Sequence, residues 1–200
     1  MNEIDILQYG FADAKLYSCK YPKAEELNPI LHEVIIGITK DSEHPNNMGA
    51  LMSEPYDFTV KEFNIIAEYA KEVLGNLKDA PYPYKPNPLK LVELWGQYYK
   101  KGDYQIAHHH NPLSWSFVYY VNAPKGSAPL VFTSSNKKIF PKPGMLVLFP
   151  SWVQHYVPKH KCEEIRSIVS GDFFYSVEWE SEESSRESTG FRGDQDEILH

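Results

Sequence analysis

Three consecutive histidines, His108, His109 and His110, stand just before the aromatic and branched stretch SWSFVYYVN. Side chains alternate between the two faces of a strand, so the pattern predicts that His108 and His110 point one way and His109 the other. Two imidazoles on one face can clamp a divalent transition metal. His155, which follows the apolar stretch GMLVLF, is the candidate third ligand. Together these residues predict a metal site.

Two other interpretations of the histidines stay open. The triplet could form a polar loop and His155 could be a solvated surface residue, as many lone histidines are. The histidines could also hold zinc structurally in a non-catalytic β-sandwich, where a fourth ligand closes the site. Cys162 and His160 are the nearby candidates for that ligand, and both stand in the polar segment PKHKCEEI, predicted to lie outside the sheet. This placement favours an open site.

Strand-like stretches from residue 91 onward must position these groups. The strand-like stretches read LVELWGQYY, SWSFVYYVN, PLVFT, GMLVLF, WVQHYV and EEIRSIVSGDFFYSVEW. Turn signals at residues 101–103, 124–126 and 141–144 lie between them. Short strands at this density predict a β-sandwich or barrel.

We expect one domain with three parts. Residues 1–90 are predicted to be a supporting segment, 91–178 the β core, and 179–200 an acidic flexible tail, with a short docking arm as the alternative for the tail. The supporting segment contains a predicted helix at about residues 60–78, where apolar residues recur at helical spacing and form a stripe that packs on the sheet. These residues are Phe63, Ile66, Ala67, Ala70, Leu74 and Leu77. Thr59 with Glu62 matches a capping box that would start this helix. The proline-rich segment DAPYPYKPNPLK then predicts an irregular surface connection.

The composition restricts the class of protein and its partners. The formal net charge of -7 predicts no basic face, which argues against a nucleic-acid backbone as the main partner. No apolar stretch approaches the length of a membrane span, and the N-terminus lacks the pattern of a signal peptide. Cys19 and Cys162 are the only cysteines and give no disulfide framework, which fits a reducing cytoplasm. The sequence thus predicts a soluble cytoplasmic domain and does not indicate its oligomeric state.

The segment YKKGDYQIAHHHNPLSWSFVYYVN resembles the first half of a double-stranded β-helix, the cupin-like jelly roll of iron(II)- and 2-oxoglutarate-dependent oxygenases of the prolyl-hydroxylase type. Those proteins read Tyr-x-x-Gly, then His-x-Asp, then a strand; here Tyr99 and Gly102 precede His108 and His110. The segment PKPGMLVLFPSWVQHYVPKHKCEEIRSIVSGDFF resembles the second half, with a Pro-x-x-Gly turn, a distal histidine and an arginine. The chain is most similar to a subfamily that reads His-x-His. The resemblance covers residues 91–177.

The resemblance implies roles for individual residues. His108 and His155 take the two histidine positions of the metal triad, and His110 takes the position usually held by Asp. Arg166 takes the position of the residue that binds the distal carboxylate of 2-oxoglutarate, for which a planar guanidinium is well suited. Tyr120 is a second candidate for that carboxylate. Further candidates to contact the substrate or to support the ligands are Tyr99, Asn111, Ser116 and Ser170.

The resemblance also implies iron(II) as the metal and 2-oxoglutarate as the co-substrate, with ascorbate as a further candidate cofactor. The expected reaction is hydroxylation of a C–H bond with release of succinate and CO2. The sequence does not indicate whether the substrate is a small molecule or a protein residue.

Two positions depart from the family pattern. With His110 in place of a carboxylate, three neutral imidazoles would leave the metal its full charge, which alters its potential for oxygen activation. A cupin-like three-histidine dioxygenase that does not use 2-oxoglutarate is therefore the alternative, with Arg166 binding a substrate carboxylate. For Arg166 itself, a surface ion pair with Glu163 or Glu164 is the other interpretation. Phe117 stands where the subfamily has Gly, and strand alternation predicts that it faces away from the metal.

Overall fold

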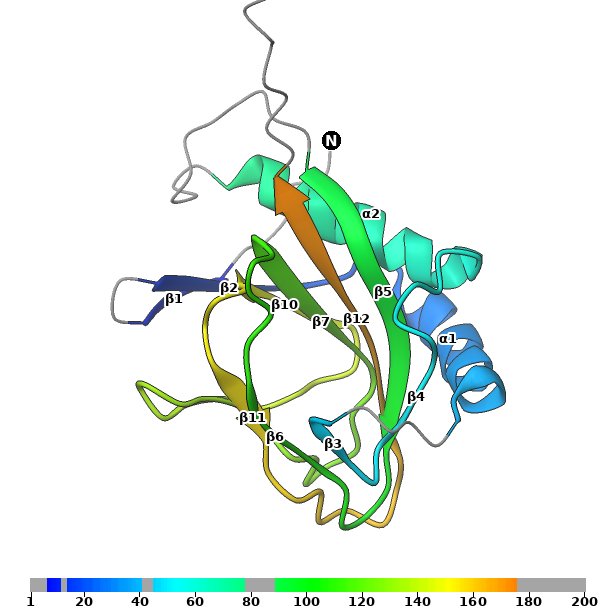
Figure 1. Cartoon of the computed structure of the whole chain (residues 1–200). Helices are drawn as coiled ribbons and strands as arrows, with labels where there is room; N and C mark the ends of the chain where they lie inside the picture. The colour runs from blue at the N-terminus through cyan, green and yellow to red at the C-terminus, as the bar shows by residue number, and fades with distance from the viewer. Residues whose placement is uncertain (1–6, 12–13, 41–44, 78–88, 176–200) are drawn as a thin grey trace, which may run out of the picture.

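The computed structural model describes residues 7–11, 14–40, 45–77 and 89–175, which form two antiparallel β-sheets and two helices (Figure 1). The seven-stranded sheet has the order β1-β2-β10-β7-β12-β5-β4, and the five-stranded sheet has the order β3-β6-β11-β8-β9. The strands are β1 (Leu7–Phe11), β2 (Ala14–Lys20), β3 (Asn47–Met48), β4 (Leu51–Met52), β5 (Leu89–Tyr99), β6 (Tyr104–His108), β7 (Trp115–Asn122), β8 (Leu130–Phe132), β9 (Lys137–Ile139), β10 (Met145–Pro150), β11 (His155–Val157) and β12 (Arg166–Tyr175). The prediction of a mainly β jelly roll is confirmed. The tail at 179–200 and most of the proline-rich connection lie outside the described residues.

Helices α1 (Ala24–Ile38) and α2 (Lys61–Asn76) cover one face of the seven-stranded sheet (Figure 1). They pack closely against β5 at Gly96, where a Cβ atom would lie 2.6 Å from a ring carbon of Phe63 and 2.9 Å from a side-chain carbon of Ile35. Phe63 and Ile35 are fully buried in the core between helices and sheet. The helices therefore hold the large sheet from outside and leave its other face to the second sheet.

The segment before residue 90 contains more regular structure than the sequence predicted. Helix α2 lies at the predicted position, but α1 was not predicted, and strands β1 to β4 belong to the two sheets. The predicted capping box is wrong. Val60 is the N-cap residue of α2 and no side chain caps the helix, while the Thr59 hydroxyl donates to Oδ1 of Asp57 at 3.3 Å.

Successive side chains of β7 point to opposite faces of the seven-stranded sheet and so belong to two different apolar cores. Ser116, Val118 and Tyr120 face the space between the sheets, where Val118 and Tyr120 join one apolar cluster. Phe117 and Tyr119 belong to the cluster on the helix side. The position of Phe117 in the helix-side core agrees with the alternation predicted from the sequence. The polar side chain of Ser116 faces the space between the sheets, so a functional site is expected there.

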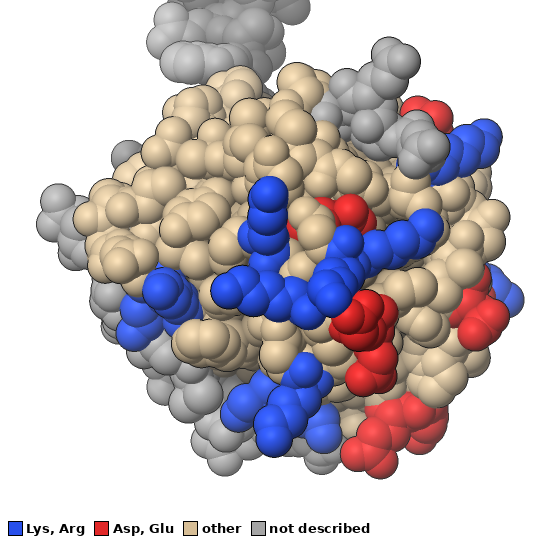
Figure 2. All heavy atoms as spheres, turned by 90° about the horizontal axis from the view of Figure 1, so that it is seen from below, with Lys and Arg blue, Asp and Glu red and all other residues tan. Residues whose placement is uncertain are grey.

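Charged residues on the surface are unevenly distributed. Lysine and arginine side chains gather on the face at the lower end of Figure 1, with acidic side chains beside them (Figure 2). The turn at residues 100–103 and the loop at 158–164 hydrogen-bond to each other at this end. Their exposed lysines are Lys100, Lys101, Lys159 and Lys161. This face is more basic than the net charge suggested. None of the helices that the structure describes is long and apolar enough to cross a membrane.

Candidate metal and co-substrate site

The five-stranded sheet brings two of the predicted histidines side by side. His108 ends β6 and His155 begins β11, and the two residues are partners in the antiparallel register. His110 lies beyond the end of β6, in the connection to β7, where its backbone N–H donates to the Ser151 carbonyl at 2.7 Å. The prediction that strand alternation alone would align His108 and His110 is therefore incomplete. A backbone bond to the turn after β10 places the third imidazole.

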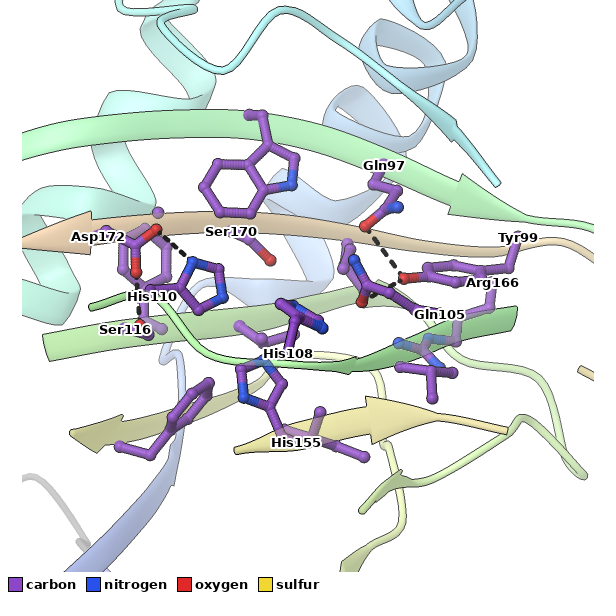
Figure 3. A pocket seen from close by; sticks show the side chains of 18 residues that line it. Gln97, Tyr99, Gln105, His108, His110, Ser116, His155, Arg166, Ser170 and Asp172 are labelled. Atoms are coloured by element: carbon purple, nitrogen blue, oxygen red, sulfur yellow. Dashed lines mark hydrogen bonds and ion pairs between the residues drawn. The ribbon is translucent and has the colours of Figure 1, made fainter. Parts of the chain in front are cut away.

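The three imidazole rings surround one small space (Figure 3). The ring centroids are 4.4 Å apart for His108 and His155, 5.1 Å for His108 and His110, and 5.3 Å for His110 and His155. One nitrogen from each ring lies within 4.8 Å of the others. Three nitrogens that share one ion at a bond length of about 2.1 Å lie about 3.0–3.4 Å from one another, so shifts of about 1 Å or less in each ring bring the three nitrogens to a shared ion.

The hydrogen bonds of two rings fix which nitrogen can bind a metal. Nδ1 of His108 lies 2.8 Å from the Ile106 carbonyl, and Nδ1 of His155 lies 2.9 Å from the Val153 carbonyl. A carbonyl oxygen only accepts, so both Nδ1 atoms must carry the proton and donate it. The lone pair is then on Nε2 of each ring. Backbone acceptors thus orient both imidazoles as neutral ligands.

His110 differs from the other two rings because its neighbour is acidic. Nδ1 of His110 lies 3.1 Å from Oδ2 of Asp172, a carboxylate with no exposed surface. Burial lowers the pKa of His110, but Asp172 and then Glu93 outweigh burial, so the pKa is raised. The pKa of His155 falls well below its usual value, through burial and then through the charges of His108 and His110. His155 is therefore held neutral, as metal binding requires.

The group of three histidines contains no fourth protein ligand among the described residues. His160 is buried, and its ring nitrogens lie 3.0 Å from the Glu164 carbonyl and 3.4 Å from the Ala128 N–H. Cys162 is half-buried and outside the group. A structural zinc site would be closed by such a ligand, whereas three ligands leave open positions, as a catalytic metal needs.

Alternate residues of β12, from Arg166 to Asp172, point into the cavity and form one of its walls. Arg166, Ile168, Ser170 and Asp172 alternate along the strand and all border the cavity. Arg166 is only 1% exposed, so a surface ion pair with Glu163 or Glu164 is wrong for it. Its Nη1 donates to the Ala128 carbonyl at 2.9 Å, whereas its Nε has no hydrogen-bond partner among the described residues.

Two aromatic rings lie beside this guanidinium, and amides surround the hydroxyl of one of them. Its central carbon lies 4.5 Å from the centroid of the Tyr99 ring and 5.4 Å from that of Tyr120. The Tyr99 hydroxyl lies 3.0 Å from Oε1 of Gln97 and 3.3 Å from Oε1 of Gln105. Both glutamine amides also donate to Oδ1 of Asn47, at 2.9 and 3.0 Å. The pKa of Tyr99 is raised, chiefly by burial, so its hydroxyl stays protonated.

The structure brings most, but not all, of the other predicted residues to the cavity. Tyr99, Ser116 and Ser170 line it. Tyr120 is buried beside Arg166 without lining the cavity, and its hydroxyl has no partner among the described residues. Asn111 is exposed and does not line the cavity; its backbone N–H donates to Nδ1 of the neighbouring His109. Asn111 thus fits the predicted turn better than a contact with substrate.

Sequence reasoning missed the acidic pair beside His110. Asp172 and Glu93 are cross-strand partners on β12 and β5, and each offers a carboxylate oxygen within 4.8 Å of a His110 nitrogen. The pKa of Glu93 is raised, first by burial and then by Asp172. The signal was present in the sequence, because Asp172 lies on the same strand face as Arg166 when β12 is extended.

The cavity between these groups is narrow. About 380 Å³ of empty space lies between its lining atoms, open solvent included, but only about 20 Å³ can hold the centre of a water molecule. Apolar rings form part of its wall: Phe149 lies edge-on to His155 with centroids 4.7 Å apart, and Trp95 stacks on His110 at 6.1 Å. These rings cover His155 and His110, whereas His108 is only half-buried. A ligand larger than a few atoms requires side chains on the wall to move.

Comparison with solved structures identifies the fold, although the sequence matches no protein-family model and no curated protein. A viral collagen prolyl hydroxylase from Paramecium bursaria Chlorella virus-1, in complex with 2-oxoglutarate, is 15% identical, with a TM-score of 0.60 over 78% of this chain and 94% of that one. A prolyl-4-hydroxylase from Pseudomonas putida is 16% identical, with a TM-score of 0.59 over 82% and 95%. HygX from Streptomyces hygroscopicus, with nickel and 2-oxoglutarate bound, is 11% identical, with a TM-score of 0.58 over 80% and 83%. The chain therefore has the jelly-roll fold of prolyl hydroxylases and other 2-oxoglutarate- and iron(II)-dependent oxygenases.

Proposed function

We propose that this chain is an iron(II)- and 2-oxoglutarate-dependent oxygenase that hydroxylates a C–H bond of its substrate. One observation carries the proposal: a single cavity contains three imidazoles with converging nitrogens and a buried guanidinium that has no acidic partner among the described residues. The fold shared with prolyl hydroxylases supports it. Iron(II) with 2-oxoglutarate and oxygen would supply the oxidation of the C–H bond, with succinate and CO2 as the other products.

The residues present fit a metal of this kind. His108, His110 and His155 would hold the ion, because imidazole nitrogens suit iron and other first-row metals and the bonds of their Nδ1 atoms already orient them. The apolar rings of Phe149 and Trp95 beside them would exclude water from the reacting groups. The protein's part is thus to orient the ligands and to keep the site dry.

Arg166 would bind the distal carboxylate of 2-oxoglutarate. A buried cation with an unused N–H is unfavourable unless an anion compensates it, and a carboxylate pairs with guanidinium through two parallel hydrogen bonds. The Tyr99 ring lies against the guanidinium in a cation–π contact, which stabilises the buried cation at the cavity. Tyr120, whose buried hydroxyl has no partner among the described residues, is a further donor in this proposal.

A second candidate function is a three-histidine dioxygenase that does not use 2-oxoglutarate. The ligand set favours it, since the group formed by His108, His110 and His155 contains three imidazoles and no carboxylate. In that case Arg166 would bind a carboxylate of the substrate itself.

Anaerobic titration with iron(II), followed by 2-oxoglutarate, tests the proposed function. We expect a visible metal-to-ligand charge-transfer band in the wild-type protein, since it reports chelation of the co-substrate to iron. His155→Ala should abolish the band by removing a ligand, and Arg166→Met should abolish it at moderate 2-oxoglutarate concentrations. His109→Ala, which removes an exposed imidazole next to the site, is the matched control and should keep the band. Wild-type protein that binds iron(II) but gives no band would favour the second candidate.

Both predicted substrate classes have counterparts among the structural neighbours. One neighbour is a collagen prolyl hydroxylase and another is HygX with hygromycin B bound. We therefore propose to screen proline-containing peptides and small molecules for succinate formation above the substrate-free rate, with and without ascorbate. A cytoplasmic location remains a prediction from the sequence.

A further inference from the structure

The three candidate ligands differ in what binds their outer nitrogen. Nδ1 of His108 and Nδ1 of His155 face neutral backbone carbonyls, whereas Nδ1 of His110 faces the carboxylate of Asp172. A carboxylate oxygen at this distance favours the tautomer with the proton on Nδ1, which leaves the lone pair on Nε2, as in the other two rings. A carboxylate behind a metal-bound histidine makes the imidazole a stronger donor than a carbonyl does. His110 is thus the one candidate ligand of the three whose outer nitrogen faces an acidic side chain.

The protein holds Asp172 firmly in this position. Its side chain has no exposed surface, and Oδ1 accepts a hydrogen bond from the Ser116 hydroxyl, which lies 2.9 Å from the Ser151 hydroxyl. Oδ2 has no hydrogen bond of ordinary geometry, and its contact with His110 is an ion-pair contact at 3.1 Å. Among the described residues no lysine or arginine pairs with Asp172, whose other close titratable neighbour is Glu93. A buried carboxylate without a basic partner is unfavourable unless another positive charge compensates it.

We propose that Asp172 is a positioning residue that fixes His110 for metal binding and supplies, through that ring, the negative charge that a carboxylate ligand would otherwise contribute. The inference rests on the proposed metal site. Strand β12 then serves the site at two positions on one face, with Arg166 for the co-substrate and Asp172 for the metal. In the resembled family the negative charge lies on a carboxylate that binds the metal itself. Here it would lie on Asp172, one side chain farther from the metal, behind His110.

The substitution Asp172→Asn tests this directly because it keeps the shape and removes the charge. The amide oxygen can still accept from Ser116, but the amide NH2 then faces His110 and favours the tautomer with the proton on Nε2, the nitrogen that must bind the ion. Loss of such an outer partner typically lowers metal affinity by about 10-fold to 100-fold. We expect that loss for cobalt(II), measured by visible absorption without 2-oxoglutarate, together with a change of the bands at saturating metal.

A second background separates this role from general support of the fold. In His110→Asp, the ligand is a carboxylate that needs no outer acceptor and is repelled by Asp172. Adding Asp172→Asn to that background should leave cobalt(II) affinity unchanged or raise it, the reverse of its effect beside His110. A merely structural role predicts the same loss in both backgrounds. If Asp172→Asn does not fold, Ser116→Ala, which removes one hydrogen bond from Asp172, should lower cobalt(II) affinity several-fold, and no change in it would overturn the proposal.

The outcomes distinguish this inference from the proposed function. Wild-type protein that binds no cobalt(II) would overturn the metal centre and this role together. Wild-type binding with the same affinity and bands in folded Asp172→Asn would overturn the role of Asp172 alone. Uptake of two ions per chain, the second lost in Asp172→Asn, would instead make Glu93, His110 and Asp172 a metal site of their own and overturn the proposal.

Discussion

Arg166→Met separates a ligand-binding arginine from a structural one. Methionine keeps much of the length and apolar volume of arginine and removes the charge. In the absence of ligand, the change removes two stabilising contacts: the hydrogen bond to the Ala128 carbonyl and the contact with the Tyr99 ring. It also removes a destabilising feature, a buried cation without an acidic partner among the described residues. Because the losses and the relief of burial oppose each other, we expect the free energy of unfolding to change by less than about 2 kcal/mol.

The effect on ligand binding should be much larger. Two charge-assisted hydrogen bonds to a carboxylate contribute at least about 3 kcal/mol, so their loss raises the Kd of 2-oxoglutarate by at least about 100-fold. At a concentration 100 times the wild-type Kd, the ligand stabilises the wild-type protein by about 2.7 kcal/mol but the variant by only about 0.4 kcal/mol. For a domain of this size these energies correspond to Tm increases of about 5–11 °C and about 1 °C.

Thermal melting with manganese(II), with and without 2-oxoglutarate, measures both quantities at once. Lys101→Met, which removes an exposed cation, is the matched control and should keep the full Tm increase. An Arg166→Met protein that melts near the wild-type temperature and retains the full increase with 2-oxoglutarate would refute the assignment of Arg166 to the co-substrate. A variant that is unfolded without ligand would show that the guanidinium is structural.

Three further changes test other parts of the account. His155→Ala should lower cobalt(II) affinity by at least about 100-fold in titration, since it removes one of three ligands; an unchanged affinity would mean that the ion binds elsewhere. Gly96→Ala should destabilise the fold by about 1–3 kcal/mol in urea unfolding, because its Cβ would clash with Phe63 and Ile35, and wild-type stability would contradict the close helix packing. Thr59→Ala should change stability by less than about 0.5 kcal/mol, since Thr59 does not cap α2; a loss of 1 kcal/mol or more would restore the capping box.

The sequence predicted the features that depend on strand alternation. The apolar runs from residue 91 onward predicted β5, β7, β8, β10, β11 and β12, but not β6 or β9. The two-residue period placed Ser116 on the cavity side and Phe117 on the helix side, as the structure has them. The positions of Ser116 and Phe117 could be predicted because they depend on local periodicity. The buried position of Arg166 at the cavity was implied by the family resemblance and not by the strand period.

Features that depend on tertiary context could not be predicted. Pro29 lies inside α1 and made this segment a poor helix candidate, yet packing against the sheet stabilises it. His110 reaches the site from a connection held by Ser151, a residue distant in sequence. The contact between His110 and Asp172 joins a loop to the middle of β12, and only the register of that strand with β7 and β5 creates it.

Anomalous diffraction from crystals grown with zinc(II) tests the central claim most directly, because it locates the ion without reference to activity. The account predicts one strong peak between β6, β11 and the connection after β6, about 2.0–2.1 Å from Nε2 of His108, His110 and His155, with open positions toward Arg166. A peak bound by Glu93, Asp172 and Nδ1 of His110, or ring nitrogens that stay too far apart to share an ion, would contradict it.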